Sequence, residues 1–418
     1  MNPEATVDLS DGQSFAAGFP HDFFTRLRAD APLWWHAPTA ATPDGEGFWV
    51  LSRYADVDAV IMDAQSFSSD TAGARNGGGT AIKDEPTAGK VLNHTDDPHH
   101  RRLRDLVNKG FTVKAVAALE DELRRRTREL LAAIVPGETF DFAQRFAREI
   151  PTQAICIVLG VPETDREQLC DWVDAGIEAP SDSVIAAEYA RPIRRYAQSL
   201  IDAKRAQPTQ DIFSIIVQAR HETDGTALTD QELRSFFTLL FPAGAETTTR
   251  AISGGLHAFL EHPDQWRHLC ADTGRARSAA EEIVRWTTPS VYKRRTATRD
   301  VTLHGQTIHA GDKVTFWEMS ANRDERVFTA PFAFDITRSP NRHLGFGAGV
   351  HFCLGAALAR LELRVVLEEL VARGLDFEFA GAPVWVPNNR LFGLKSLPVR
   401  TLARATACAD CEPAAKGQ

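Results

Sequence analysis

The chain has 418 residues, of which 43% are hydrophobic and 25% are charged, an ordinary composition for a globular protein. Its formal net charge of −9 argues against bulk attraction to nucleic acid or to an anionic membrane surface. No apolar run approaches the ~18 residues of a membrane span, and the polar, acidic N-terminus does not resemble a signal peptide.

The first part of the chain mixes helical and strand patterns around one long loop. DFFTRLRAD, residues 22–30, predicts a short helix, and FWVLSRY, residues 48–54, predicts a strand. Residues 68–90 are rich in Gly, Ser, Thr and Ala, which predicts a long mobile loop that opens as a lid. Helical patterns then dominate, and we predict helices over residues 97–134, 141–160, 163–178, 184–206, 211–222, 229–261 and 276–286.

Short strands and one last helix complete the predicted elements. A strand pair is expected within 299–319, turning at His304 and Gly305, and a helix over 353–373. Residues 403–418 read as a disordered tail, whose lone CxxC, Cys408 and Cys411, predicts no metal or redox site. The pattern is that of a mostly helical chain with a minor β part and no break in composition.

Six cysteines are scattered without a framework spacing, which predicts a reduced, cytoplasmic protein. Cys353, in the stretch FGAGVHFCLG, differs from the others in its surroundings. A lone cysteine is usually a small buried hydrophobe, but this one comes just before a helical pattern, where the helix dipole favours a thiolate. Gly347, Gly349 and Gly355 would let the backbone bend and a flat group approach. A single thiolate beside a planar group indicates haem iron, with Phe346 shielding the sulfur.

The predicted helix over 229–261 is long enough to cross a whole domain. Thr229 and Glu232 have the spacing of a capping box at its start. Near the middle, Pro242 removes one helical hydrogen bond and Gly244 weakens the same turn. A helix broken at its centre usually makes room for something.

An acid and an alcohol, Glu246 and Thr247, follow this break. Together they could relay protons from solvent to a bound species. The alternative is that the Thr247 hydroxyl bonds back to a helix carbonyl and Glu246 is a surface charge.

Three motifs, in chain order, resemble the cytochrome P-450 superfamily. Phe346, Gly349, Cys353 and Gly355 match the haem-binding signature F-x-x-G-x-x-x-C-x-G. The resemblance implies that Cys353 is the axial thiolate of heme b. A-G-x-E-T, at residues 243–247, is similar to the family's oxygen-binding groove, where the alcohol and the acid deliver protons.

The third motif is E-x-x-R, met by Glu282 and Arg285. The residues alone allow a solvated surface pair, whereas the resemblance implies a buried structural pair. The family often adds an arginine further along, and in PFAFDITR that position falls on Ala333, which leaves the third partner open.

The resemblance also implies cations that hold the two haem carboxylates. Without the resemblance, each of these residues would be an ordinary surface cation. Arg294 is the adjacent alternative to Arg295, and His99 is the adjacent alternative to His100. The matching positions are His100, Arg104, Arg295 and His351.

The similarity covers about residues 15–402 and implies one mainly α domain with a small β region, the prism-shaped P-450 fold. It implies a soluble bacterial haem-thiolate monooxygenase that hydroxylates a C–H bond. No flavin or iron–sulfur fingerprint follows the haem segment, so a separate ferredoxin-type donor with its reductase is expected. Basic residues that could dock such an acidic donor are Arg101, Arg102, Lys109, Arg342, Arg360 and Arg364.

The substrate pocket is expected to be mostly apolar, with Lys293 near it as a candidate partner for a carboxylate. A free lipophilic substrate of terpenoid, steroid or fatty type fits this lining, and an amino acid or acyl group on a carrier protein is the alternative. A haem-binding sensor or carrier without turnover, and peroxide-driven chemistry, are further alternatives. The predicted lining is Phe237, Leu240, Ala243, Gly244, Ser290, Val291, Tyr292, Leu391 and Phe392.

Overall fold

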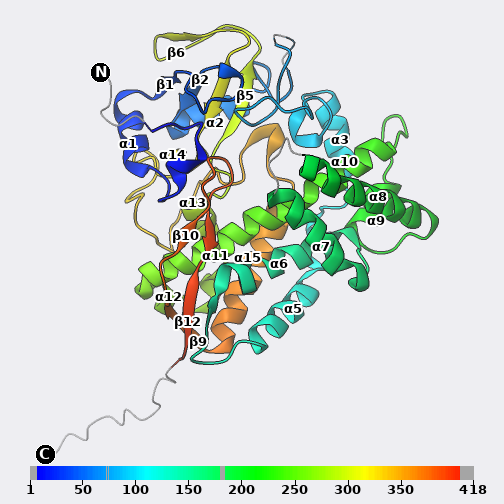
Figure 1. Cartoon of the computed structure of the whole chain (residues 1–418), viewed down its shortest axis with the longest axis vertical. Helices are drawn as coiled ribbons and strands as arrows, with labels where there is room; N and C mark the ends of the chain where they lie inside the picture. The colour runs from blue at the N-terminus through cyan, green and yellow to red at the C-terminus, as the bar shows by residue number, and fades with distance from the viewer. Residues whose placement is uncertain (1–6, 72, 74, 179–183, 405–418) are drawn as a thin grey trace, which may run out of the picture.

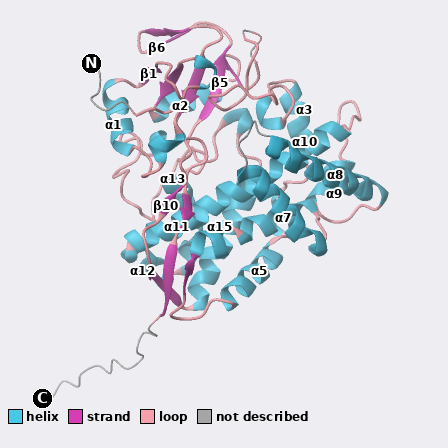
Figure 2. Cartoon of the chain, viewed as in Figure 1, coloured by secondary structure: helices cyan, strands magenta, loops and turns pink. Residues whose placement is uncertain are grey.

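The computed structural model describes residues 7–71, 73, 75–178 and 184–404, and helices make up most of it (Figures 1 and 2). The helices are α1 (His21–Asp30), α2 (Tyr54–Met62), α3 (His99–Asn108), α4 (Val113–Ala117), α5 (Glu120–Ala132), α6 (Glu149–Leu159), α7 (Glu163–Glu178), α8 (Val184–Ala206), α9 (Ile212–Gln218), α10 (Asp230–Phe241), α11 (Thr247–Glu261), α12 (Pro263–Ala271), α13 (Ala276–Thr287), α14 (Glu318–Ala321) and α15 (Ala356–Arg373). None of the helices in these ranges combines the length and the apolar character needed to cross a bilayer.

Short strands form small sheets. They are β1 (Leu33–His36), β2 (Phe48–Leu51), β3 (Phe67–Ser68), β4 (Thr139–Asp141), β5 (Lys293–Ala297), β6 (Val301–Leu303), β7 (Gln306–Ile308), β8 (Lys313–Phe316), β9 (Leu375–Phe379), β10 (Val384–Trp385), β11 (Leu394–Ser396) and β12 (Pro398–Ala403). This agrees with the predicted mainly α fold with a small β region.

The largest sheet joins segments that are far apart in the sequence. Its order is β1-β2-β8-β5-β3, with β2 and β8 parallel and the other pairs antiparallel. Trp49 of β2 pairs with Val314 of β8, and every residue of β8 is buried. The sheet therefore carries β5, and with it Arg295, against the N-terminal part of the chain.

The helices at the centre of Figure 1 form the second part of the core. α11 packs against α13 and α15, and α15 also packs against α5. Their apolar faces share one cluster that includes Ile252, Ile283 and Leu367. The cysteine loop, residues 346–355, leads into α15, and α11 begins at Thr247, directly after Glu246. The packing of α11 against α15 therefore brings the two predicted motifs to one region.

The predicted helix over 97–134 is wrong in its continuity. It is divided into α3, α4 and α5, with breaks around Gly110 and Leu119. A Cβ on Gly110 would lie 2.7 Å from Ile212 Cγ2, and the Thr112 side chain caps α4 by accepting from the Ala115 N–H. Tertiary packing and a local cap therefore outweigh the continuous helical pattern.

The loop predicted as a mobile lid is fastened to the rest of the molecule by arginines. Arg294 Nη1 donates to Gly78 O at 3.1 Å and to Asp84 Oδ1 at 2.7 Å. Arg390 Nη1 donates to Glu85 Oε1 at 2.9 Å. These two arginines thus stabilise the loop in its observed position.

Candidate active site

The cysteine loop is closed by its own backbone. The Cys353 N–H donates to Phe346 O at 2.9 Å, and the Gly347 N–H donates to Leu344 O at 2.8 Å. Gly347 and Gly349 have φ angles of +67° and +62°, a region that favours glycine. The loop therefore holds the thiol near the first turn of α15, which begins three residues later.

The surroundings of Cys353 shift the pKa of its thiol in opposite directions. The residue has accessible surface, but protein atoms surround it densely, and this burial raises the pKa of the thiol. The Gly355 N–H and the positive charges of Lys293, Arg104 and Arg360 lower the same pKa. A metal ion bound to the sulfur would complete the stabilisation of the thiolate.

Three of the four predicted haem cations meet above the start of α3. The rings of His100 and His351 lie 4.2 Å apart between centroids, and His351 Nε2 lies 3.0 Å from Ser69 Oγ. Burial lowers the pKa of His351 to about 2, with further lowering by the charges of Arg295, His100 and Arg104. The imidazole of His351 is therefore neutral at pH 7 in this arrangement.

The fourth cation, Arg295, is buried on β5. Its guanidinium lies 5.2 Å from the Phe316 ring centroid, and its Nη1 donates to Arg294 O at 2.9 Å. Burial lowers its pKa to about 10. The adjacent alternatives lie elsewhere, since Arg294 contacts the 78–84 loop and His99 lies 3.6 Å from Glu232.

These residues fit a planar dianion next to the thiol. Within the described ranges, neither Arg104 nor Arg295 has a carboxylate oxygen within 4 Å, although burial lowers the pKa of both. A Cβ on Gly355 would meet nothing within 4 Å, so the space beside the loop is open. Buried cations without a carboxylate in ion-pair contact favour a bound anion, and the two carboxylates of haem meet that requirement.

The turn that holds Glu246 and Thr247 interrupts a long helix as predicted. A five-residue π-helical turn, Pro242–Glu246, separates α10 from α11. Thr247 Oγ1 donates to Ala243 O at 2.8 Å, which is the back-bonding arrangement weighed for this hydroxyl. Glu246 is half-buried and not a fully solvated surface charge, and its burial raises the pKa of its carboxyl. Pi-turns of this kind are frequent at functional sites.

Comparison with known proteins identifies the family. The cytochrome P450 family model matches residues 183–399. A Mycobacterium tuberculosis protein that carries the name cytochrome P450 126 is 49% identical over 400 residues, which is 94% of this chain and 97% of that protein. The chain belongs to the cytochrome P450 family. It is a monooxygenase of that family, and the family implies a haem cofactor.

Further relatives of this P450 carry names that state a reaction. The methyl-branched lipid omega-hydroxylase of M. tuberculosis is 38% identical over 391 residues, covering 90% of each chain. The steroid C26-monooxygenase of the same species is 36% identical over 397 residues, covering 93% of this chain and 91% of that one. A solved Mycobacterium marinum cytochrome P450 in complex with pseudoionone is 35% identical, with a TM-score of 0.84 over 96% of this chain and 99% of that one.

The E-x-x-R pair of this P450 has a third partner that was not predicted. Glu282 and Arg285 are fully buried, with Arg285 Nη2 2.7 Å from Glu282 Oε1. Arg338 Nε lies 3.2 Å from Glu282 Oε2 and supplies the second cation. Ala333, the position that left the third partner open in the sequence, accepts hydrogen bonds from both arginines through its carbonyl oxygen. The arginine is displaced by five residues along an irregular segment, where spacing is a poor guide.

The predicted pocket residues divide into two groups. Ala243 is exposed, and Ser290 forms a β-bridge with Leu391, which joins two of the predicted lining segments. Others pack their side chains into the core, as Phe237 does against Phe213, with 5.8 Å between ring centroids. The predicted lining residues that are buried in this way are Phe237, Leu240, Val291, Tyr292 and Phe392.

Lys293, predicted as a candidate partner for a substrate carboxylate, already has one within the chain. Its Nζ donates to Oε2 of Glu318, which is buried. Glu318 lies 25 residues away on α14, and only the pairing of β5 with β8 brings the two together. Sequence reasoning missed this pair because neither residue has a local signal.

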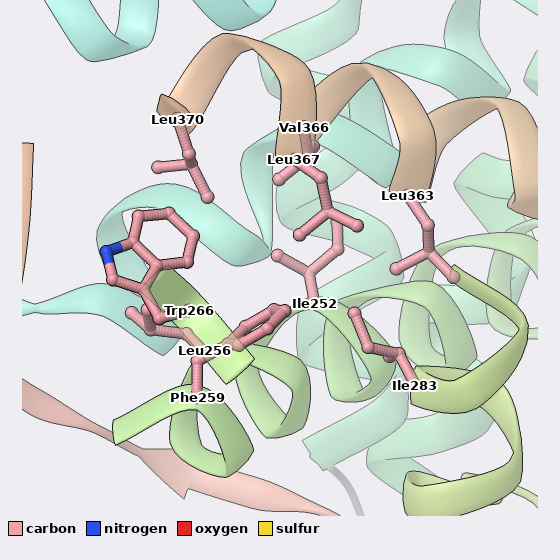
Figure 3. Close-up of a pocket in the computed structure, with 9 residues that line it drawn as sticks. All are labelled: Ile252, Leu256, Phe259, Trp266, Ile283, Leu363, Val366, Leu367 and Leu370. Carbon is pink, nitrogen blue, oxygen red and sulfur yellow. The ribbon is translucent and has the colours of Figure 1, made fainter. Parts of the chain in front are cut away.

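A separate apolar pocket lies between α11, α12, α13 and α15 (Figure 3). Side chains from these four helices point toward one another there, among them Ile252, Trp266, Ile283 and Leu367. The lining includes no residue of the cysteine loop or of the Glu246–Thr247 turn. It is a packing gap in the helical core and not the site of the chemistry.

Glu362, on α15, is buried, and its Oε2 has no hydrogen-bond partner in the part of the chain that the structure describes, which predicts a pH-dependent stability. It is 2% exposed, its Oε2 has no hydrogen-bond partner, and burial raises the pKa of its carboxyl to about 8 from 4.5. Because the folded state keeps this proton and the unfolded state releases it above pH 4.5, stability falls as the pH rises from about 4.5 to about 8. We expect Glu362→Gln to remove this decline.

The expected gain of the variant over the parent grows between pH 5 and pH 8 to on the order of 3 kcal/mol in free energy of unfolding. Urea unfolding at four pH values measures it. Glu167→Gln, at an exposed position on α7, is the control. Parallel pH curves for Glu362→Gln and the parent would contradict the prediction.

Proposed function

We propose that this P450 binds heme b through Cys353 and hydroxylates a C–H bond of a free lipophilic substrate of lipid or steroid type. The observation that carries the substrate class is the identity, 38% and 36%, to relatives named for a lipid omega-hydroxylation and a steroid C26-monooxygenation. When bound, haem would supply the activation of dioxygen for transfer of one oxygen atom to the substrate.

Residues of the chain would bind the haem carboxylates and deliver protons. His100, Arg104, Arg295 and His351 would hold the haem carboxylates, supported by the convergence of these side chains in one place. Thr247 and Glu246 would move protons between solvent and the site. Residues 15–402 would form the monooxygenase domain. The proposed tail, residues 403–418, lies outside the described residues from residue 405 onward, and so do Cys408 and Cys411.

Electrons would come from a ferredoxin-type donor and its reductase. Val350 and Phe352 lie within the cysteine loop and are 42% and 39% exposed, which gives a donor an apolar contact next to Cys353. Most of the predicted basic docking residues are engaged within the chain, as Arg360 is with Glu281 at 2.6 Å. Free thiols at Cys156, Cys170 and Cys270 support a reducing, cytoplasmic location.

The substrate class is tested by titrating the purified haem protein with three sets of compounds, namely methyl-branched fatty acids, sterols, and acyl or aminoacyl groups on a carrier protein. A spin-state shift followed by hydroxylated product in the presence of ferredoxin and reductase is expected for the first or second set. Turnover of the carrier-bound set alone would overturn the proposal. Full activity with peroxide, and none with the reductant, would overturn the electron-transfer part.

Proton delivery predicts that Thr247→Ala and Glu246→Gln uncouple the enzyme. The variants would still consume electrons and oxygen, but product formed per electron would fall by at least about tenfold, because positioned proton transfer contributes roughly 10²-fold or more. The measurement is product and peroxide per reducing equivalent. Thr249→Ala, two residues further on the same helix, is the matched control. Unchanged coupling in both variants would contradict the role and favour a haem protein without turnover.

A further inference from the structure

Arg250 lies one helical turn beyond Glu246 and is built into the surrounding structure. Its Nη1 donates to Leu394 O at 3.0 Å, at the start of β11. The neighbouring Gly393 leaves room for the arginine stem, since a Cβ at that position would lie 2.5 Å from Arg250 Cδ. The side chain is therefore held in place from outside its own helix.

One donor of this guanidinium, Nε, has no hydrogen-bond acceptor in the part of the chain that the structure describes. Arg250 Nε is buried, and it has no hydrogen-bond partner among the residues that the structure describes. Glu246 and Arg250 are four residues apart at the start of α11, which places them on one face of the helix. Arg250 thus offers a buried donor without a partner on the helix face that also carries the half-buried Glu246 carboxyl, while the two groups lie more than 4 Å apart in this structure.

The charges around Glu246 leave Arg250 as its counter-ion. Burial raises the pKa of Glu246, and the positive charge of Arg250 lowers it, while the reciprocal field of Glu246 raises the pKa of Arg250. In the described ranges no other charged group acts on Glu246. The ionisable groups on the helices packed against this turn are Glu149 and Cys156 on α6 and Asp230, Glu232 and Arg234 on α10, with His257 and Glu261 further along α11. Lys395 lies on β11, which packs against α11, and Asp230 and Glu232 are paired with Arg205 and Arg102.

We propose that Arg250 is a positioning residue that orients the Glu246 side chain and balances its charge during proton delivery. This inference rests on the proposed role of Glu246. When the carboxyl gives its proton toward Thr247 it becomes a carboxylate, and the Arg250 Nε–H stabilises that negative charge until a solvent proton replaces the lost one. Arg250 itself keeps all its protons throughout, since a guanidinium does not deprotonate in proteins.

The decisive measurement is the protonation of Glu246 in the resting ferric protein, without turnover. The carboxylic acid stretch that Glu246→Gln removes from the infrared spectrum is followed against pH in the parent, in Arg250→Gln and in Arg250→Lys. Loss of the positive charge is expected to raise the midpoint by about one pH unit or more. Arg250→Lys keeps the charge and is expected to stay near the parent value. An unchanged midpoint in Arg250→Gln would overturn the inference.

The pH profile of coupled product formation separates this inference from the proposed function. In Arg250→Gln, the pH above which coupled product formation falls (the alkaline limb) is expected to rise together with the infrared midpoint. In Arg250→Lys, this pH is expected to return to the parent value. If Glu246→Gln leaves coupling unchanged, proton delivery by Glu246 fails, and the positioning role fails with it. If Glu246→Gln uncouples the enzyme but Arg250→Gln moves neither the midpoint nor the limb, only the positioning role is overturned. Haem content and thermal midpoint, measured on each variant, show that it is folded.

Discussion

Replacing Cys353 by alanine is expected to abolish the strongly red-shifted Soret band of the ferrous–carbonyl complex. That band requires a thiolate bound to the haem iron, and Cys353 is the cysteine held at the mouth of α15 by the 2.9 Å bond from its N–H to Phe346 O. The positive charges of Lys293, Arg104 and Arg360 lower the pKa of the same thiol. Loss of the ligand removes both the band and the oxygenase activity.

The comparison that decides this prediction is with a second cysteine variant. Cys270→Ala, at a half-buried position on α12, is expected to keep the full red-shifted band. Cys353→His offers a nitrogen ligand at the same place and is expected to give a histidine-type spectrum if the pocket still binds haem. A parent-like band in Cys353→Ala would remove the axial assignment and, with it, the proposed oxygen chemistry.

The second large effect concerns the buried pair Glu282 and Arg285. Arg285→Ala is expected to lower the free energy of unfolding by about 3–5 kcal/mol, because it leaves a buried carboxylate with less compensation. Both side chains are completely buried. Arg285 also donates to Asn322 O and Pro331 O at 2.9 Å each, so its loss frees the segment that leads to the cysteine loop.

A pair of the same spacing on the surface provides the control. Glu122 and Arg125 are also three residues apart and lie 2.6 Å from each other on α5, but their side chains are 35% and 47% exposed. Arg125→Ala is expected to lower the free energy of unfolding far less than Arg285→Ala does, because an exposed ion pair contributes little. Urea unfolding of both variants measures the contrast, and Arg285→Lys serves if Arg285→Ala does not fold. A cost for the buried variant no larger than for the surface variant would contradict the prediction.

Local signals in the sequence were sufficient where the interacting residues are close along the chain. The capping box at the start of α10 is present, with the Thr229 N–H donating to Glu232 Oε2 at 2.7 Å and the Glu232 N–H donating to Thr229 Oγ1 at 3.2 Å. The break after Phe241 follows from Pro242, because a proline removes a hydrogen bond wherever the helix is placed. Helix α7 begins at the predicted residue, Glu163.

Local patterns failed where a distant segment decides the outcome. The helical pattern over 97–134 is continuous, but the close approach of Ile212 to Gly110 contributes to its division. Short helices α2, α12 and α14 were not predicted, since a few turns of helix carry little periodicity and gain most of their stability from tertiary contacts.

For the site, the sequence by itself determined the type of chemistry, because the ligand loop, the acid–alcohol turn and the Glu–Arg motif are each contained within ten residues. Only the tertiary structure decided which charges meet. It brings Arg338 to Glu282, Lys293 to Glu318 and Arg250 to Leu394 across 56, 25 and 144 residues. Such pairs form because burial makes an unpaired charge or donor costly, and that cost depends on which segments pack together, not on spacing along the chain.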